Sequence, residues 1–464
     1  MASRHDLEGG PASRSEESEE LVSQDGPVED GETAGQAVGR SGRPLASRLA
    51  GGLGILAAVP AGAVAGSAVL IGVAAVTANR VLAGLAGAAA MVAVALAVAW
   101  WGATRVATAA WARRALAGAA VGVSIVLVGG AGWVLVYAPA PEVATPDSKG
   151  VAYWDLATGS RIAYRHAPAE AGSGAAPVVL VHGGPGAPDS DPAGVAVRLS
   201  AAGFDVYRYD QIGAGLSRRL DDVAGYTVAR HVADLEAIRE AIGAQQMILV
   251  GSSWGGTLIA SYLAEHPDRV ARAVISSPSP LWAPAFDDDA RLTEAGRQDQ
   301  MAVVADHPRF AVANVMLDTL GVRTSRALFP DRQIDGVFAQ VIDQIDLRPG
   351  CPATADAVDD AVTGVGFWAN AMTVRSSREV ADPRPALSAL DVPVLVLRAE
   401  CDYLAWEVTR EYRDVLPGAI LVPVDDAGHG VARDRPDRYV DIVRSFLVDG
   451  THDGEPYTSD RAPW

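Results

Sequence analysis

Residues 247–256 constrain the fold of this chain more than any other segment. They read MILVGSSWGG, an apolar run typical of a buried strand that ends in the pattern Gly-x-Ser-x-Gly, and a helical pattern follows over 257–265. In that setting the pattern predicts a nucleophile elbow, a strand-to-helix turn so tight that only small residues fit beside the serine. Gly251 and Gly255 meet this requirement, and Ser253 is the predicted nucleophile. Because the five-residue pattern also occurs by chance, its meaning depends on further signals along the chain.

A glycine-rich loop after an earlier strand is the second signal. Residues 176–181 form a short β-branched run, and His182-Gly-Gly-Pro-Gly follows directly. Without a Cβ, glycines let backbone N–H groups converge on one point, and such a loop forms an oxyanion hole together with the residue after the nucleophile. The expected oxyanion donors are the backbone N–H groups of Trp254 and of Gly184, with Gly183 as the alternative to Gly184. Trp254 and Gly183 are also expected to contact the substrate. A plain strand-to-loop turn is the simpler interpretation, and His182 is expected to support the loop.

Two later strand ends supply an acid and a base. A buried strand at 392–398 is followed by Glu400 and Asp402, and a strand at 419–424 is followed by His429. The chain order Ser, Asp, His is that of the α/β-hydrolase triad. In this triad the serine attacks, the histidine takes and returns its proton, and the aspartate fixes the tautomer of the imidazole. We favour Asp402 over Glu400 because it lies beyond the strand end, where the loop can turn toward His429.

These motifs resemble those of the proline iminopeptidase group of serine peptidases. The shared segments are HGGPG at 182–186, DQIGAGLS at 210–217 and GSSWGGTL at 251–258. The resemblance covers residues 150–450 and is dense up to about residue 280. It implies an α/β-hydrolase fold with a helical cap, and an aminopeptidase that releases N-terminal residues from short peptides through an acyl-enzyme.

The chain departs from that group at positions that bear on the substrate. Ile212 stands where the group usually has arginine. The group's cap holds glutamates that bind the free amine of the substrate, one of them in a Trp-Glu pair, whereas Glu294 and Glu379 are the only glutamates of the cap here and neither lies in a matching motif. These departures favour an alternative, an esterase or lactonase on small apolar acyl compounds. A catalytically inactive hydrolase fold used as a sensor or scaffold is the third hypothesis.

Residues 49–138 contain three long stretches without a charged residue, separated by arginines. Because a bilayer span needs about 20 apolar residues, we expect transmembrane helices at 51–77, 81–103 and 115–138. Arginines gather before the first stretch and between the second and third, which predicts a cytoplasmic N-terminus and, with three spans, an extracytoplasmic catalytic domain. If the first stretch, which Pro60 weakens as a helix, did not span the membrane, the catalytic domain would lie on the cytoplasmic side.

Small residues recur at every fourth position within two of these stretches. The pairs are Gly62 with Gly66 and Gly118 with Gly122. This spacing suits close packing of transmembrane helices, and an alanine- and glycine-rich span without that role explains it equally well. The sequence leaves the two interpretations open.

The remaining pattern predicts how the chain divides. Strands alternate with helices from residue 151 onward, which predicts a mostly parallel sheet with helices on both faces. The alternation is interrupted by a long helical insertion, the predicted cap. The expected segments are a disordered acidic segment (1–48), the membrane region (49–138), a linker (139–150), the first part of the α/β-hydrolase core (151–278), the helical cap (279–391), the second part of the core (392–450) and a C-terminal tail (451–464).

Composition limits the classes of molecule that this chain is expected to bind. The formal net charge is −18 and there is no basic stripe, so nucleic acid is a poor candidate partner. The expected partners are the lipid bilayer and a small-molecule or short-peptide substrate. The histidines show no paired spacing and no phosphate-binding glycine loop with lysine occurs, so neither a metal nor a cofactor is implied. An extracytoplasmic location would permit a disulfide between Cys351 and Cys401, but the sequence does not establish one.

Overall fold

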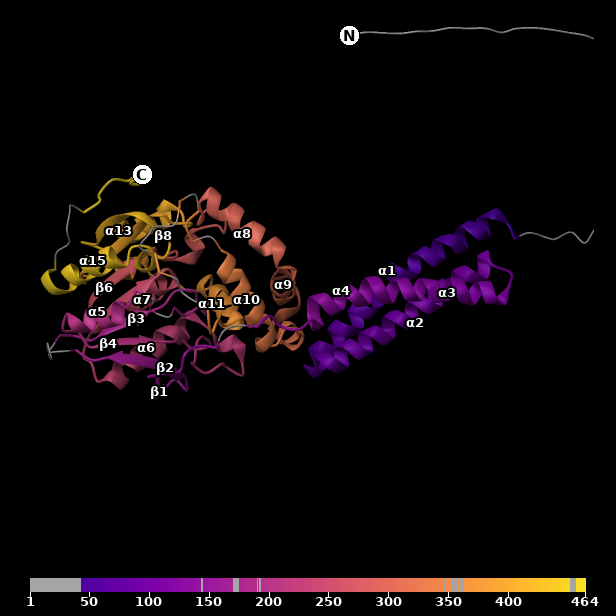
Figure 1. Ribbon diagram of the computed structural model, residues 1–464, viewed down its shortest axis with the longest axis horizontal. Coiled ribbons are helices and arrows are strands. Elements are labelled where there is room, and N and C mark those ends of the chain that lie inside the picture. Colours follow the sequence, from indigo (N-terminus) through magenta and orange to yellow (C-terminus); the bar gives the residue numbers. More distant parts are fainter. Residues whose placement is uncertain are drawn as a thin grey trace, which may run out of the picture.

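The computed structural model describes an apolar helical bundle and a larger domain built on a sheet (Figure 1). The described residues are 43–142, 145–169, 175–189, 191, 193–345, 347–349, 351–352, 357–358, 362–450 and 456–464. The acidic segment is predicted to be disordered, and its residues 1–42 lie outside the described ranges. Residues 45–48, assigned to that segment from the sequence, are already helical, because Leu45 and Ala46 extend the apolar run that follows.

Three apolar helices form the bundle. The first two are α1 (Leu45–Thr77) and α2 (Arg80–Val106). The third is a continuous run made of α3 (Ala110–Ser124), η1 (Ile125–Gly129), α4 (Gly130–Gly132) and η2 (Trp133–Tyr137). Each of the three is long and apolar enough to cross a membrane by length and composition. The predicted number of apolar helices is therefore confirmed, and α1 continues through Pro60.

The two glycine pairs of the bundle differ in their surroundings. A Cβ on Gly66 would lie 2.8 Å from the Cβ of Met91 on α2, and one on Gly62 would lie 3.0 Å from the carbonyl oxygen of the same residue. A Cβ on Gly118 or Gly122 would meet nothing within 4 Å. Close helix packing therefore explains the first pair, and an alanine- and glycine-rich span without that role explains the second.

The larger domain is built on one eight-stranded sheet with the strand order β1-β2-β4-β3-β5-β6-β7-β8. The strand β2 is antiparallel to β1 and β4, and all other neighbours are parallel, which confirms the predicted mostly parallel sheet. The strands are β1 (Ala152–Asp155), β2 (Arg161–Ala167), β3 (Val178–Val181), β4 (Val206–Tyr209), β5 (Met247–Ser252), β6 (Val270–Ser276), β7 (Val394–Cys401) and β8 (Ile420–Gly428).

Both faces of this sheet are buried, which is why its strands read as unbroken apolar runs. Successive residues of β3, Val178 and Val179, pack into two different clusters of buried side chains. One cluster includes α5 (Val195–Ala201) and α15 (Pro436–Asp449). The other includes α6 (Val228–Ile242), α7 (Trp254–Glu265) and α13 (Trp406–Val415). Shorter elements are η3 (Val223–Gly225), η4 (Pro267–Arg269), η5 (Ala283–Ala285), α12 (Arg384–Leu387) and α14 (Val431–Asp434).

A helical insertion between β6 and β7 forms the cap. Its main helices are α8 (Glu294–Asp306), α9 (Pro308–Leu328), α10 (Asp331–Gln344) and α11 (Phe367–Ser377). Four aromatic rings pack against one another, with ring centroids 5.0 to 6.1 Å apart, and form the interior of the cap; they belong to Phe310, Phe338, Phe367 and Trp368.

The cap rests on the end of the bundle, where Figure 1 shows α9 beside it. Arg323 of α9 donates to the carbonyl oxygen of Val76, in the last turn of α1, at 3.3 Å. Arg309 of α9 donates to that of Pro139 at 3.1 Å. A Cβ on Gly336 of α10 would lie 2.6 Å from the carbonyl oxygen of Pro141. The first residues of the predicted linker are thus packed against the cap.

Candidate active site

The predicted elbow is present between β5 and α7. Ser253 is the single residue between them and has φ 53 and ψ −122, a conformation that L-residues rarely adopt. A Cβ on Gly255 would run into the carbonyl oxygen of Val181, and one on Gly251 would lie 2.7 Å from the side chain of Ile259. The small residues that the pattern requires are therefore needed for packing. The Ser253 hydroxyl lies 3.3 Å from that of Ser279.

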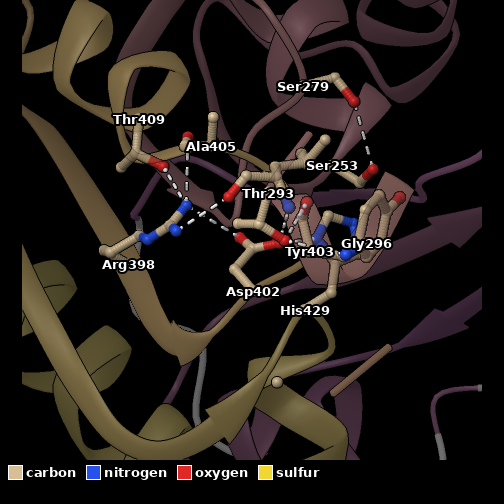
Figure 2. A network of polar contacts seen from close by, with 12 residues as sticks. Ser253, Ser279, Thr293, Gly296, Arg398, Asp402, Tyr403, Ala405, Thr409 and His429 are labelled. Atoms are coloured by element: carbon tan, nitrogen blue, oxygen red, sulfur yellow. Dashed lines mark hydrogen bonds and ion pairs between the residues drawn. The ribbon is translucent and has the colours of Figure 1, made fainter. Parts of the chain in front are cut away.

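The structure brings the predicted acid and base together. The Nδ1 of His429 donates to the Oδ1 of Asp402 at 2.7 Å, and both side chains are buried (Figure 2). Asp402 also accepts a hydrogen bond from the backbone N–H of Leu404 at 3.0 Å and lies 3.4 Å from the Arg398 guanidinium. Glu400 instead accepts the backbone N–H of Asp426 at 2.8 Å. The preference for Asp402 over Glu400 agrees with this arrangement.

Electrostatics keep the Asp402 carboxyl ionised. Burial by itself would raise the pKa of Asp402, but the charge and hydrogen bond of His429, together with Arg398, hold that pKa below its ordinary value. The ionised carboxylate accepts the proton on Nδ1 of His429, which leaves Nε2 as the basic nitrogen. This Nε2 is buried and has no hydrogen-bond partner among the described residues. His429 and Ser253 line the same cavity.

Tyr403 is a residue of this site that the sequence analysis did not single out. Its ring lies 4.3 Å from that of His429, and Figure 2 shows it beside the Ser253 side chain. Burial, with a smaller contribution from the charge of Asp402, raises the pKa of Tyr403 to about 12, so the hydroxyl stays protonated. Its place directly after Asp402 was the available signal, but the sequence does not reveal where the ring points.

The glycine-rich loop lies against the nucleophile. A Cβ on Gly183 would lie 3.2 Å from the Cβ of Ser253. Gly184 has a φ of 110, which favours glycine and turns the loop at this point. Trp254 begins α7, so its backbone N–H belongs to the first turn, where amides lack partners within the helix. Of the residues predicted to bind the oxyanion or the substrate, Gly183 lies against Ser253, Trp254 follows it in the chain, and Gly184 lines the same cavity.

Gln211 ties the loop to the helix that follows the nucleophile. Its backbone N–H donates to Nε2 of His182 at 2.9 Å, so Nδ1 of His182 carries the proton and donates to the carbonyl oxygen of Gly183 at 2.7 Å. The side-chain amide of Gln211 donates to the His182 carbonyl oxygen at 2.8 Å and accepts from the indole N–H of Trp254 at 3.0 Å. His182 therefore supports the loop, as expected, and burial lowers its pKa, which keeps it neutral.

One cavity is lined by the nucleophile, and a second is lined by its neighbours Trp254 and Ser279. One has a volume of 280 Å³ and is lined by Ser253, Gly183, Tyr403 and His429 among others. The other has a volume of 350 Å³ and is lined by Trp254 and by the beginning of the cap. Gly184 borders both. Within the described ranges, no group of three or more histidine, cysteine, aspartate or glutamate side chains could hold a metal ion.

Comparisons with known proteins agree with this architecture. Residues 176–334 match the alpha/beta hydrolase fold family. The proline iminopeptidase of Heyndrickxia coagulans is 24% identical over 299 residues, which cover 62% of this chain and 96% of that protein. That of Lactobacillus delbrueckii subsp. bulgaricus is 26% identical over 282 residues, which cover 59% of this chain and 90% of that protein. Among solved structures, the enol-lactonase from Burkholderia xenovorans aligns with a TM-score of 0.42 and 20% identity over 64% of this chain and 99% of its own.

The family match and the observed topology together show that the chain contains an α/β-hydrolase domain. The predicted fold is confirmed, and so is the resemblance to proline iminopeptidases, which are homologues of low identity.

Proposed function

We propose that this chain, which has the α/β-hydrolase fold, is a membrane-anchored serine hydrolase that releases N-terminal residues from short peptides. One observation carries the catalytic part: Asp402 holds His429 by a 2.7 Å hydrogen bond, which leaves the buried Nε2 as a base in the cavity that Ser253 also lines. Ser253 attacks the substrate carbonyl, and His429 takes the hydroxyl proton and returns it to the leaving group. Water then hydrolyses the acyl-enzyme by the same route.

In this proposal each of the two cavities binds a different part of the substrate. The leaving group receives its proton from His429 and therefore occupies the cavity that His429 lines. The acyl group occupies the cavity beside Trp254. The developing oxyanion accepts hydrogen bonds from the backbone N–H groups of Gly184 and Trp254, each contributing about 3 kcal/mol to the stability of the transition state.

Binding of a free amine in the acyl cavity requires an acid there. The cavity is lined by Asp287 and Asp288. Arg378 donates to both carboxylate oxygens of Asp288, at 2.7 and 2.9 Å. Asp287 is exposed and, among the described residues, takes part in no ion pair, so its carboxylate is the one that an N-terminal ammonium group would meet. The proline iminopeptidase homologues support the aminopeptidase activity itself.

A second candidate is an esterase or lactonase on small apolar acyl compounds. The observation that favours it is the position of the cap glutamates, because neither Glu294 nor Glu379 lines either of the two cavities described above. The carboxylate of Glu294 already accepts hydrogen bonds from Arg297 and Gln298. The acyl cavity also has apolar walls, formed by Pro280, Pro284, Phe286 and Val374.

Asp287→Asn separates the two candidates. We measure kcat/KM of the full-length protein in lipid nanodiscs for a prolyl arylamide and for a short-chain aryl ester without an amine. For an aminopeptidase, the substitution lowers arylamide turnover by about 10- to 100-fold, the value of a charge-assisted hydrogen bond, and leaves the ester within about twofold. Asp289→Asn is the matched control, since Asp289 lines neither cavity. Ester turnover without any arylamide turnover in the wild type would establish the second candidate.

We also propose that the three apolar helices span the membrane, with the N-terminus in the cytoplasm and the catalytic domain on the opposite side. In this proposal the helices do more than tether, because Arg323 of the cap donates a hydrogen bond to Val76 of the bundle and Arg309 donates one to Pro139 of the linker.

Removal of the bundle tests this added role. A fragment of residues 145–464 is expected to hydrolyse the ester at the wild-type rate, because none of the predicted site residues lies in the bundle. It should melt several degrees lower, since each lost hydrogen bond contributes about 1 kcal/mol and 1 kcal/mol corresponds to about 2 °C in a domain of this size. Scanning calorimetry of the fragment beside full-length protein measures the difference, and Arg323→Ala in the full chain is expected to reproduce part of it. Equal melting temperatures would mean that the bundle only tethers.

A further inference from the structure

Three cap residues that follow α10 contact both loops of the proposed catalytic pair. They are Leu347, Arg348 and Cys351, which we call the clasp. The carbonyl oxygen of Leu347 accepts the backbone N–H of His429 at 2.7 Å. Cys351 forms a disulfide with Cys401, with the two Cα atoms 6.0 Å apart. Because Cys401 directly precedes Asp402, the clasp is joined covalently to the acid and by a hydrogen bond to the base.

Arg348 adds a buried ion pair to this contact. Its guanidinium lies 3.2 Å from the Asp434 carboxylate and donates to the carbonyl oxygen of Asp426 at 3.3 Å. Asp434 in turn accepts the backbone N–H of Gly428 at 2.7 Å. The clasp therefore holds the chain on both sides of His429.

The packing at Gly428 shows how closely the clasp fits this loop. A Cβ at that position would lie 2.5 Å from the carbonyl oxygen of Leu347 and would also run into the side chain of Arg348. The loop before His429 is thus in direct backbone contact with the cap.

We propose that the clasp is a positioning device, through which the cap keeps Asp402 and His429 in the correct position relative to each other. This inference rests on the proposed function of the pair. The two residues come from different strand ends, because Asp402 directly follows β7 and His429 directly follows β8. A displacement of about 1 Å between catalytic groups can lower a rate about 100-fold. Arg348 and Cys351 line neither cavity, so they act on the reaction through Asp402 and His429 and not through the substrate.

Two changes open the clasp without altering a group that touches substrate. Arg348→Met removes the charge and keeps much of the apolar stem, and Arg348→Lys restores a charge for Asp434. Reduction of the folded protein by a phosphine opens only Cys351–Cys401, because the chain has no other cysteine. Reduction after folding avoids a failure to fold. Arg375→Met is the matched control, since Arg375 is a cap arginine that pairs with Asp318, away from both loops.

The readout separates positioning from stability. Full-length protein in nanodiscs is incubated with a fluorophosphonate probe, and we measure both the fraction of chains labelled at completion and the rate for each labelled chain. We expect Arg348→Met and reduction each to lower the rate about tenfold or more while nearly all chains are labelled at completion. Arg348→Lys should give an intermediate rate, and the KM for an aryl ester should change less than twofold.

Other results would overturn the inference. Fewer labelled chains that each react at the wild-type rate would show that the clasp only stabilises the fold. An equal slowing by Arg375→Met would show that any loss of a cap ion pair has this effect. Absence of labelling in the wild type is a different outcome, because it would refute the proposed function itself.

Discussion

Ser253→Ala is expected to lower the turnover of either substrate by about 10⁶-fold, the loss typical of a nucleophile that acts as one unit with its base. The methyl group cannot form the acyl-enzyme, and what remains is the stabilisation provided by the oxyanion hole and by substrate binding. The fold should survive, because the substitution removes side-chain contacts with Ser279 and Tyr403 and leaves the backbone hydrogen bonds of Ser253 to Ser276 and Gly256 in place. Initial rates of the full-length protein in nanodiscs, with circular dichroism as a check of folding, measure the effect.

Ser261→Ala serves as the matched control for this substitution. Ser261 lies in α7, and its hydroxyl donates only to the carbonyl oxygen of Thr257 among the described residues. Its activity should stay within about twofold of wild type. If Ser253→Ala kept more than a tenth of the wild-type rate, the reaction would not pass through this serine.

Asp402→Asn is expected to lower kcat by about 10⁴-fold. The Oδ1 of Asp402 accepts from both His429 and the backbone N–H of Leu404, and Oδ2 faces Arg398. An amide cannot satisfy all three donors. Its NH₂ group either opposes the Arg398 guanidinium or faces Nδ1 of His429, which forces the proton onto Nε2 and removes the base. Single-turnover rates on the aryl ester measure the loss of the acylation step.

Glu400→Gln is the control for Asp402→Asn, because it changes a neighbouring carboxylate that bonds to Asp426 and not to His429. It should retain nearly full activity. A larger loss in Glu400→Gln than in Asp402→Asn would reverse the assignment of the acid, for which the sequence favours Asp402 over Glu400.

The catalytic candidates could be predicted because each is part of a short sequence pattern, a strand followed by its loop. Each candidate directly follows a strand of the parallel part of the sheet: Ser253 follows β5, Asp402 follows β7 and His429 follows β8. Parallel strands have their carboxyl ends at the same edge, so residues far apart in the sequence meet there. Each residue could therefore be recognised from a short apolar run and the loop after it.

The contacts between the cap and the rest of the chain could not be predicted in this way. The sequence permits the disulfide between residues 50 positions apart but does not establish it, and the clasp reaches the His429 loop from an insertion with no strand pattern. The helical periodicity of the cap shows which residues form helices, but it does not determine against what a helix end packs. The contact of Arg323 with Val76 likewise joins residues 247 positions apart. The side chain of Tyr403 was missed for the same reason, since its direction depends on tertiary packing.

The most direct test of the central claim is to identify the residue that a fluorophosphonate probe modifies in the full-length protein. Peptide mass spectrometry should find the label on Ser253, and His429→Ala should slow the labelling by several orders of magnitude, because the serine then lacks its base. A folded protein that carries the label on another residue, or that labels Ser253 equally fast without His429, would contradict the account.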